Sequence, residues 1–173
     1  MSNEIIDRNR KLCACYPYLI PRNILTGEIV NDYDYSYIMG DFELPIGWHT
    51  LFLQFCKDIK QPLVDANYLN EFRFAQLKEK YGTLQIYHFG APEEVQNIID
   101  KYEYISQFVC VDCGSLDAQM YNYGWVSPRC KQCFKKTYQD NEVDDKFIIG
   151  GKFKNSSTLD VLDEWERLKE RRK

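Results

Sequence analysis

Two segments of the chain repeat their apolar residues at the spacing of an α-helix. Residues 48–60 form one, and residues 92–106 form the other, with Pro92 and two glutamates suited to its first turn. A helix with one apolar stripe packs that stripe against a core, so we predict two core-facing helices. The stripes are Trp48, Leu51, Phe52, Phe55 and Ile59 in the first segment, and Val95, Ile98, Ile99, Tyr102 and Ile105 in the second.

Residues 72–89, between these two segments, alternate side chains as β-strands do. Tyr81-Gly82 lies between two β-rich runs, and a glycine there favours a hairpin turn. The first run also holds Ala, Gln, Leu, Lys and Glu, so a helix remains an alternative there. In the first strand, the alternation places on one face Phe72, Phe74, Gln76 and Lys78, and on the other face Arg73, Ala75 and Leu77. In the second strand, one face has Leu84, Ile86 and His88, and the other has Gln85, Tyr87 and Phe89.

The two ends of the chain follow other patterns. Residues 1–12 are polar and charged, which is typical of a short helix or a loose arm. Proline and glycine interrupt residues 13–47, so we expect no long regular element there. Residues 157–173 repeat Leu and Trp at helical spacing after a capping sequence, which predicts a C-terminal amphipathic helix. The polar residues 135–156 before it have the composition of a linker.

Four cysteines in residues 107–134 carry the strongest chemical pattern. Cys110 and Cys113 form one Cys-x-x-Cys pair. Cys130 and Cys133 form a second pair, after sixteen intervening residues. This spacing matches zinc sites in which each pair turns both thiolates toward one ion; two unrelated pairs or a redox motif are the alternatives. Four thiolates leave no open position, so we predict one structural Zn²⁺.

The residues between the cysteine pairs predict a zinc ribbon. Gly114, directly after the first pair, suits the left-handed conformation that such a turn often needs. Residues 116–121 and 124–127 have the composition of short strands, with a turn over 122–124. We therefore expect an α+β protein: a domain over residues 1–106 with a small antiparallel hairpin sheet packed by helices, then the ribbon, the linker and the amphipathic helix.

Composition narrows the class of protein. A chain of 173 residues suits one domain with an appendage, and 45% hydrophobic with 15% aromatic residues can form a core. The net charge of -4 argues against coating nucleic acid by bulk charge, and leaves room for a local basic patch. No apolar run is typical of a signal peptide or a membrane span, so we expect a soluble, cytoplasmic protein, where paired thiols more often hold metal.

Two local patterns suggest surfaces for partners. Four cations lie around the second cysteine pair without an acidic neighbour; they either contact phosphates or stabilise the anionic metal centre. The run over residues 31–43 alternates acids and tyrosines, and it either binds a protein or anchors a long loop on the core. The candidates are Arg129, Lys131, Lys135 and Lys136 for nucleic acid, and Asp32, Tyr33, Asp34, Tyr35 and Tyr37 for protein.

The remaining cysteines and histidines carry less chemistry. Cys13 and Cys15, with Cys56 or His49, are a possible second metal site, although a free cysteine is usually a small buried hydrophobe. His88, in an aromatic strand, has the pattern of a packed residue. Neither histidine belongs to a zinc-protease or nucleophile motif, and the chain has no phosphate-binding glycine motif. Nothing in the sequence calls for an enzyme.

Six stretches occur in a fixed order within residues 13–134: YPYLIPRNILTGEIVNDYDYSY, GWHTLF, QLKEKYGTLQIYHFG, DKYEYIS, CVDCG and GWVSPRCKQC. With these motifs the chain resembles a family of uncharacterised small proteins of phages and prophages, chiefly of Gram-positive bacteria. The resemblance implies a phage-type accessory protein that works in a bacterial host cytoplasm. It supplies no catalytic residue, and the last 40 or so residues have no counterpart in it.

These patterns favour a binding protein over an enzyme. The first hypothesis is a zinc-binding phage-type accessory protein that binds a host protein, for example as an inhibitor of a bacterial defence or takeover target. The alternative is a zinc-ribbon regulator that binds nucleic acid. The acidic net charge and the acidic tyrosine run support the first, and the cations around the second cysteine pair support the second.

Overall fold

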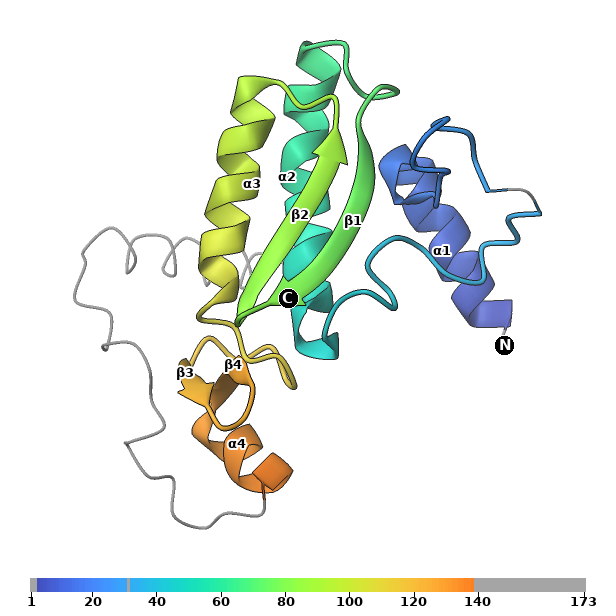
Figure 1. The fold of residues 1–173 in the computed structure, drawn as a ribbon. Coiled ribbons are helices and arrows are strands. Elements are labelled where there is room, and N and C mark those ends of the chain that lie inside the picture. Colours follow the sequence, from blue (N-terminus) through green and yellow to red (C-terminus); the bar gives the residue numbers. More distant parts are fainter. Residues whose placement is uncertain (1–2, 31, 139–173) are drawn as a thin grey trace.

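The structure is a computed structural model that describes residues 3–30 and 32–138 (Figure 1). Within these ranges the protein is α+β, as predicted, and it has four α-helices and two antiparallel two-stranded sheets. The helix expected over residues 157–173 lies outside the described residues, as does the linker from residue 139 onward.

Helices α2 (His49–Asp65) and α3 (Glu93–Ser106) confirm the two predicted apolar stripes. α2 continues past residue 60 and contains Pro62 in its last turns. A proline usually marks the end of a helix in sequence reasoning. Here Leu63, one residue later, is fully buried and continues the apolar stripe, which accounts for the longer helix.

Strands β1 (Arg73–Lys80) and β2 (Thr83–Phe89) form the predicted hairpin, so a helix over the first run is wrong. Tyr81 and Gly82 both have positive φ, which gives the tight turn that favours hairpin twist. The predicted alternation of β1 is wrong beyond Phe74, because a β-bulge at Ala75 shifts the register. The extra residue puts Leu77 in the core together with Phe74.

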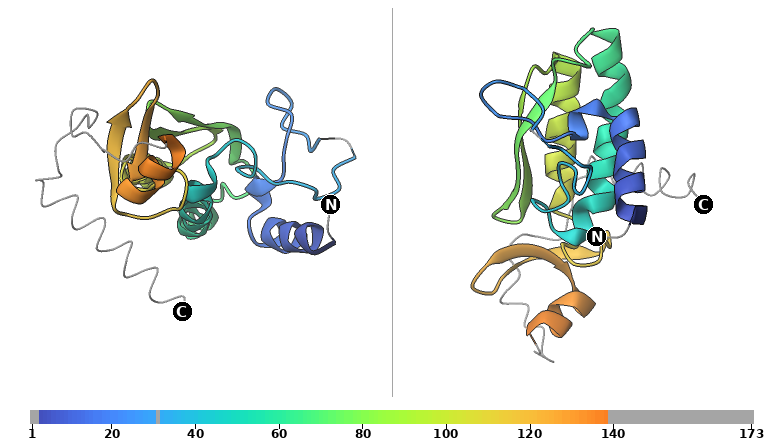
Figure 2. Two further views of the ribbon diagram at one scale, coloured as in Figure 1. Left: turned by 90° about the horizontal axis from the view of Figure 1, so that it is seen from below. Right: turned by 90° about the vertical axis from the view of Figure 1, so that its right-hand side faces the viewer.

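The core lies between the hairpin and the pair α2 and α3, which cover one face of it (Figure 1, and Figure 2, right-hand view). Phe74 of β1 packs against Phe55 of α2, with ring centroids 6.2 Å apart. Phe55 in turn contacts Tyr102 of α3 at 5.4 Å. Aromatic rings of both helices and of the sheet thus pack against one another in this core.

The N-terminal part lies beside this core. α1 (Asn3–Cys15) is a helix, longer than the short one expected over residues 1–12. After it come the short 3-10 helices η1 (Pro17–Leu19) and η2 (Ile46–Trp48), with mostly irregular chain between them, as predicted. Tyr18 and Leu19 are buried, and the Tyr18 hydroxyl donates to the Cys56 carbonyl at 2.6 Å.

The ribbon follows α3 and lies at one end of the hairpin (Figure 1). It consists of β3 (Ala118–Asn122), β4 (Val126–Cys130) and the helix α4 (Lys131–Tyr138). Asn122 pairs with Val126, so the turn comes one residue later than predicted. α4 was not predicted, and it includes the first four residues of the expected linker, 135–138.

Candidate metal centre

The four predicted cysteines meet at one point of the ribbon. Their Sγ atoms all lie within 4.8 Å of one another, and those of Cys113 and Cys130 are 3.8 Å apart. Tetrahedral zinc with Zn–S bonds of about 2.3 Å separates its sulfur ligands by about 3.8 Å. None of the four forms a disulfide. The cluster can therefore hold a metal ion, and its donor set and spacing suit zinc.

The first cysteine pair is built into the α+β core. Val109 and Val111, on either side of Cys110, belong to the main cluster of buried residues. The Cys110 carbonyl accepts a hydrogen bond from the Gly114 N–H at 2.9 Å, and the Cys110 N–H donates to the Ser115 carbonyl at 2.8 Å. Gly114 has φ +75°, the left-handed conformation predicted for it. The core thus places this half of the site.

Residues of η2 press directly against this turn. The Gly47 N–H donates to the Val111 carbonyl at 2.9 Å, and a Cβ on Gly47 would lie 2.1 Å from the Cys110 carbonyl oxygen. The buried Trp48 donates its indole N–H to the Val109 carbonyl at 2.8 Å. Only glycine at position 47 permits this close backbone approach, which anchors the turn of the first pair on the core.

The second pair belongs to the ribbon alone. Cys130 ends β4, Cys133 lies in the first turn of α4, and the Cys133 N–H points at the Cys130 sulfur at 3.4 Å. Behind it Phe134 stacks on Tyr121, with ring centroids 4.1 Å apart. A metal ion in the cluster would therefore join this ribbon helix to the core.

The thiols differ in how readily they ionise. Burial raises the pKa of Cys113 and of Cys133. Burial acts in the same direction on Cys110, but the backbone N–H groups of Cys130, Cys113 and Asp112 outweigh it and lower the pKa of Cys110. Four thiolates gathered this closely require a positive charge among them, which a bound metal cation supplies.

The structure separates Arg129 from the other predicted cations. Arg129 forms an ion pair with Asp112, a residue between the first two cysteines, and also donates to Thr137 at 3.0 Å. Its side chain is only 15% exposed. It therefore ties the two halves of the metal centre together. Lys131, Lys135 and Lys136 are exposed on α4 and have no ion pair within the described ranges.

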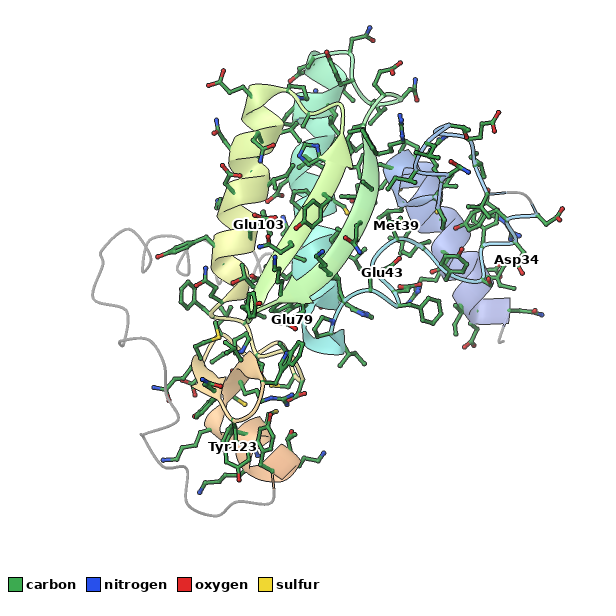
Figure 3. All side chains as sticks on the ribbon, viewed as in Figure 1. Asp34, Met39, Glu43, Glu79, Glu103 and Tyr123 are labelled. Carbon is green, nitrogen blue, oxygen red and sulfur yellow. The ribbon has the colours of Figure 1, made fainter. Side chains whose placement is uncertain are left out.

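The acidic tyrosine run is anchored on α1. Tyr33 and Tyr35 lie 4.7 Å apart between ring centroids, and the Tyr33 hydroxyl donates to the Tyr37 carbonyl at 2.8 Å. Asn9 of α1 donates to the Tyr35 carbonyl at 2.9 Å. Asp34 points away from the body of the protein (Figure 3), and Asp32 is likewise exposed. The rings are half-buried, as expected for a loop that tyrosines anchor.

The second metal site is not formed in the part of the chain that the structure describes, where only the four cysteines of the metal centre are close enough to share an ion. Cys13 contacts the Tyr33 hydroxyl, Cys15 is exposed and Cys56 is buried in the core. His49 lies near the Leu44 carbonyl. His88 stacks on Phe72, as expected of a packed residue.

Sequence reasoning missed two exposed features. The loop over residues 22–30 displays apolar side chains, and its Asn23 and Gly27 were the only local signal of a tight turn. Trp125 is 64% exposed and donates its indole N–H to Glu79 of β1. These two residues are 46 positions apart, so no local pattern could have paired them.

Comparison with protein-family models, with characterised proteins and with solved structures finds no match to this chain. Among the described helices, none has the length and apolar character needed to cross a membrane.

Proposed function

We propose that this chain is a non-enzymatic, phage-type accessory protein that binds a host protein in a bacterial cytoplasm, with one structural Zn²⁺ in the ribbon. The closed set of four thiolates supports a structural role for the metal, because no coordination position remains for a substrate. The motif resemblance motivates the phage setting, and inhibition of a defence or takeover target is one form such binding takes.

One observation carries the binding role: the loop over residues 22–30 exposes apolar side chains and is held by its own hydrogen bonds. Leu25 is 88% exposed and Ile24 is 50% exposed. A folded protein gains nothing from an apolar loop tip in water, whereas a protein partner can bury it. The other large apolar side chains of the loop are Ile29 and Val30, at 45% and 41% exposure.

Hydrogen bonds fix this loop in shape. The Asn23 side chain accepts from the backbone N–H groups of Leu25 and Thr26, at 2.9 and 3.0 Å. The Gly27 N–H donates to the Asn23 carbonyl at 2.8 Å, and Arg22 pairs with Ile29 in an isolated bridge. The loop projects from the body of the protein (Figure 2, right-hand view, blue). A preorganised loop loses little conformational entropy on binding. More of the free energy gained by burying its apolar side chains therefore contributes to affinity.

The test is capture of a host protein by the zinc-loaded chain from a bacterial lysate, compared between variants. Leu25→Ser should abolish capture, because it removes the most exposed apolar side chain of the loop tip. Val64→Ser, at a 45% exposed position on α2, is the matched control and should leave capture unchanged. A partner that wild type and Leu25→Ser capture equally would refute the role of the loop, and no specific partner would refute the function.

The second candidate is a regulator that binds nucleic acid through α4. Lys131 and Lys135 lie one helical turn apart, and both line a cleft beside the metal centre with Ser115. This role predicts DNA or RNA binding that weakens steeply with salt. Replacing both lysines by glutamate should abolish such binding. Unchanged affinity in that double variant would exclude the cluster as the site.

A further inference from the structure

A cleft of about 260 Å³ lies where the ribbon meets the end of the hairpin. Its walls come from η2 with the preceding Pro45, the end of β1, the turn between the first two cysteines, the turn between β3 and β4, and β4 itself. Figure 3 shows Glu79 at this junction, between the hairpin and the ribbon. The residues that matter for its chemistry are Pro45, Ile46, Glu79, Asp112, Trp125 and Arg129.

The cleft presents one aromatic ring that the protein leaves open. Trp125 is 64% exposed, although its indole Nε1 donates to the Glu79 carboxylate at 3.0 Å. Within the described ranges its ring stacks on no other ring and has no cation over it. Ile46, at 73% exposure, lines the same cleft. The hydrogen bond fixes the indole, so its face is available in one orientation.

The charges of the cleft are unequal. Arg129 and Asp112 neutralise each other in an ion pair. Glu79 accepts from the Gly82 N–H at 2.5 Å and from Trp125, and no cation pairs with it in the described part of the chain. A carboxylate has about four lone-pair positions, so Glu79 can accept further bonds. The cleft therefore joins an open indole face, an aliphatic wall and one uncompensated negative charge.

We propose that this cleft binds an arginine side chain presented by the partner protein, an inference that rests on the proposed function of host-protein binding. A guanidinium is planar and weakly hydrated, so it stacks on an indole while its edge donates to a carboxylate. Its three-carbon stem contacts Ile46 and Pro45. The overall charge of -4 also favours the approach of a basic segment of the partner.

The probe is a blocked peptide, acetyl-Gly-Arg-Gly-amide, titrated into the zinc-loaded full-length chain. Its counterpart carries citrulline, which keeps the shape of arginine and lacks the charge. The arginine peptide should give a saturable shift of the Trp125 indole N–H signal in ¹H–¹⁵N spectra, reduced at high salt. The citrulline peptide should give none. Equal binding of the two peptides would overturn the proposal.

Variants separate the two contributions. Glu79→Gln keeps an acceptor for Gly82 and removes the charge, and Trp125→Leu removes the ring. Each should weaken binding of the arginine peptide about tenfold, which corresponds to roughly 1.4 kcal/mol. The backbone N–H signal of Gly82, which donates to the Glu79 side chain, follows binding in wild type and in both variants. Tyr68→Leu, at an exposed ring beyond the end of α2, is the matched control and should bind as wild type does. Thermal unfolding and zinc content confirm that each variant is folded. Undiminished binding by Glu79→Gln would overturn the proposal.

The captured host partner distinguishes this proposal from the proposed function. Loss of the partner in Leu25→Ser, with full retention in Glu79→Gln and Trp125→Leu, would refute the arginine cleft and leave host binding intact. Binding of the arginine peptide by a chain that captures no host protein would refute the proposed function and leave the cleft's chemistry standing. Loss of the partner in Leu25→Ser, Glu79→Gln and Trp125→Leu alike would support both the host-binding function and the arginine cleft.

Discussion

The α+β core and the ribbon are stabilised by different means. The core buries a continuous set of apolar side chains from α2, α3 and both strands of the hairpin, with Leu51, Phe55 and Leu84 inaccessible to solvent. The ribbon has two short strands, one short helix and a small aromatic cluster around Phe134. Hydrophobic burial is enough for the first. The second is too small to bury much surface, so we expect a metal ion in the four-cysteine cluster to supply its stability.

The boundary between the two regions runs through the metal centre itself. Cys110 and Cys113 are held by the core through Gly47 and Trp48, whereas Cys130 and Cys133 are held by the ribbon. Backbone contacts also cross it, since the Val111 N–H donates to the Pro128 carbonyl at 3.0 Å. Core contacts thus position one half of the site, and we expect a bound metal ion to order the other half.

The largest expected effect comes from removing the metal or its ribbon ligands. Chelation, or Cys133→Ser, should unfold the ribbon and leave the core folded, because only the ribbon lacks a substantial apolar core. In ¹H–¹⁵N spectra the signals of β3, β4 and α4 should collapse toward random-coil positions while those of α2 and α3 keep their dispersion. Metal analysis should show loss of one bound zinc per chain.

Cys15→Ser is the control for this experiment, because Cys15 is exposed and lies outside the cluster. It should retain zinc and the full spectrum. A ribbon that stays folded without metal would contradict the dependence of the ribbon on a metal ion. Collapse of the core together with the ribbon would show that the two form one cooperative unit.

The next largest effect should come from Gly47, on the core side of the boundary. In Gly47→Ala the new methyl group would lie 2.1 Å from the Cys110 carbonyl oxygen, so the backbone has to separate. We expect a loss of about 3 kcal/mol in the free energy of unfolding, measured by urea denaturation.

Gly124→Ala, in the ribbon turn, is the matched comparison. Gly124 has φ +76° and no atom within 4 Å of the position that a Cβ would take. Only the left-handed conformation opposes the substitution, at about 1–2 kcal/mol. A cost for Gly124→Ala as large as that for Gly47→Ala would show that the steric contact with Cys110 is unimportant.

A smaller difference should separate two tryptophans. Trp48→Phe removes the donor to the buried Val109 carbonyl and leaves a small void, so we expect a loss of about 2 kcal/mol in stability. Trp125→Phe, at an exposed site, should change stability by no more than about 0.5 kcal/mol. Denaturation midpoints of the zinc-loaded variants measure both, and similar losses would contradict the assignment of Trp48 to the core.

The smallest effect concerns Glu103, whose carboxylate accepts from the Ile86 N–H of β2 at 2.7 Å. Burial raises the pKa of Glu103 above its ordinary value. The native state therefore favours the protonated form, and the contribution of Glu103 to stability falls as pH rises through the raised pKa. Glu103→Gln should be more stable than wild type at pH 7 and lose that advantage below about pH 4. A stability advantage of Glu103→Gln that grows as the pH falls would contradict a raised pKa of Glu103.

Local patterns in the sequence determined the parts of this protein that depend on neighbouring residues. The spacing of Cys110, Cys113, Cys130 and Cys133 predicted the metal cluster, because each pair needs only a short turn to aim two thiolates at one point. The helical stripes and the turn at Tyr81-Gly82 were equally local, and the structure confirms them.

The tertiary structure alone decided what depends on residues distant in the sequence. Strict alternation would place Phe74 and Leu77 on opposite faces of the strand. The bulge at Ala75 puts both on the core face, where their burial stabilises the fold. α4 forms because Phe134 stacks on Tyr121 of the neighbouring strand. The sequence identified the cysteines, but only the packing of Gly47 against the Cys110 carbonyl divides the metal centre between core and ribbon, because close approach of two backbones leaves no periodic signal in either segment.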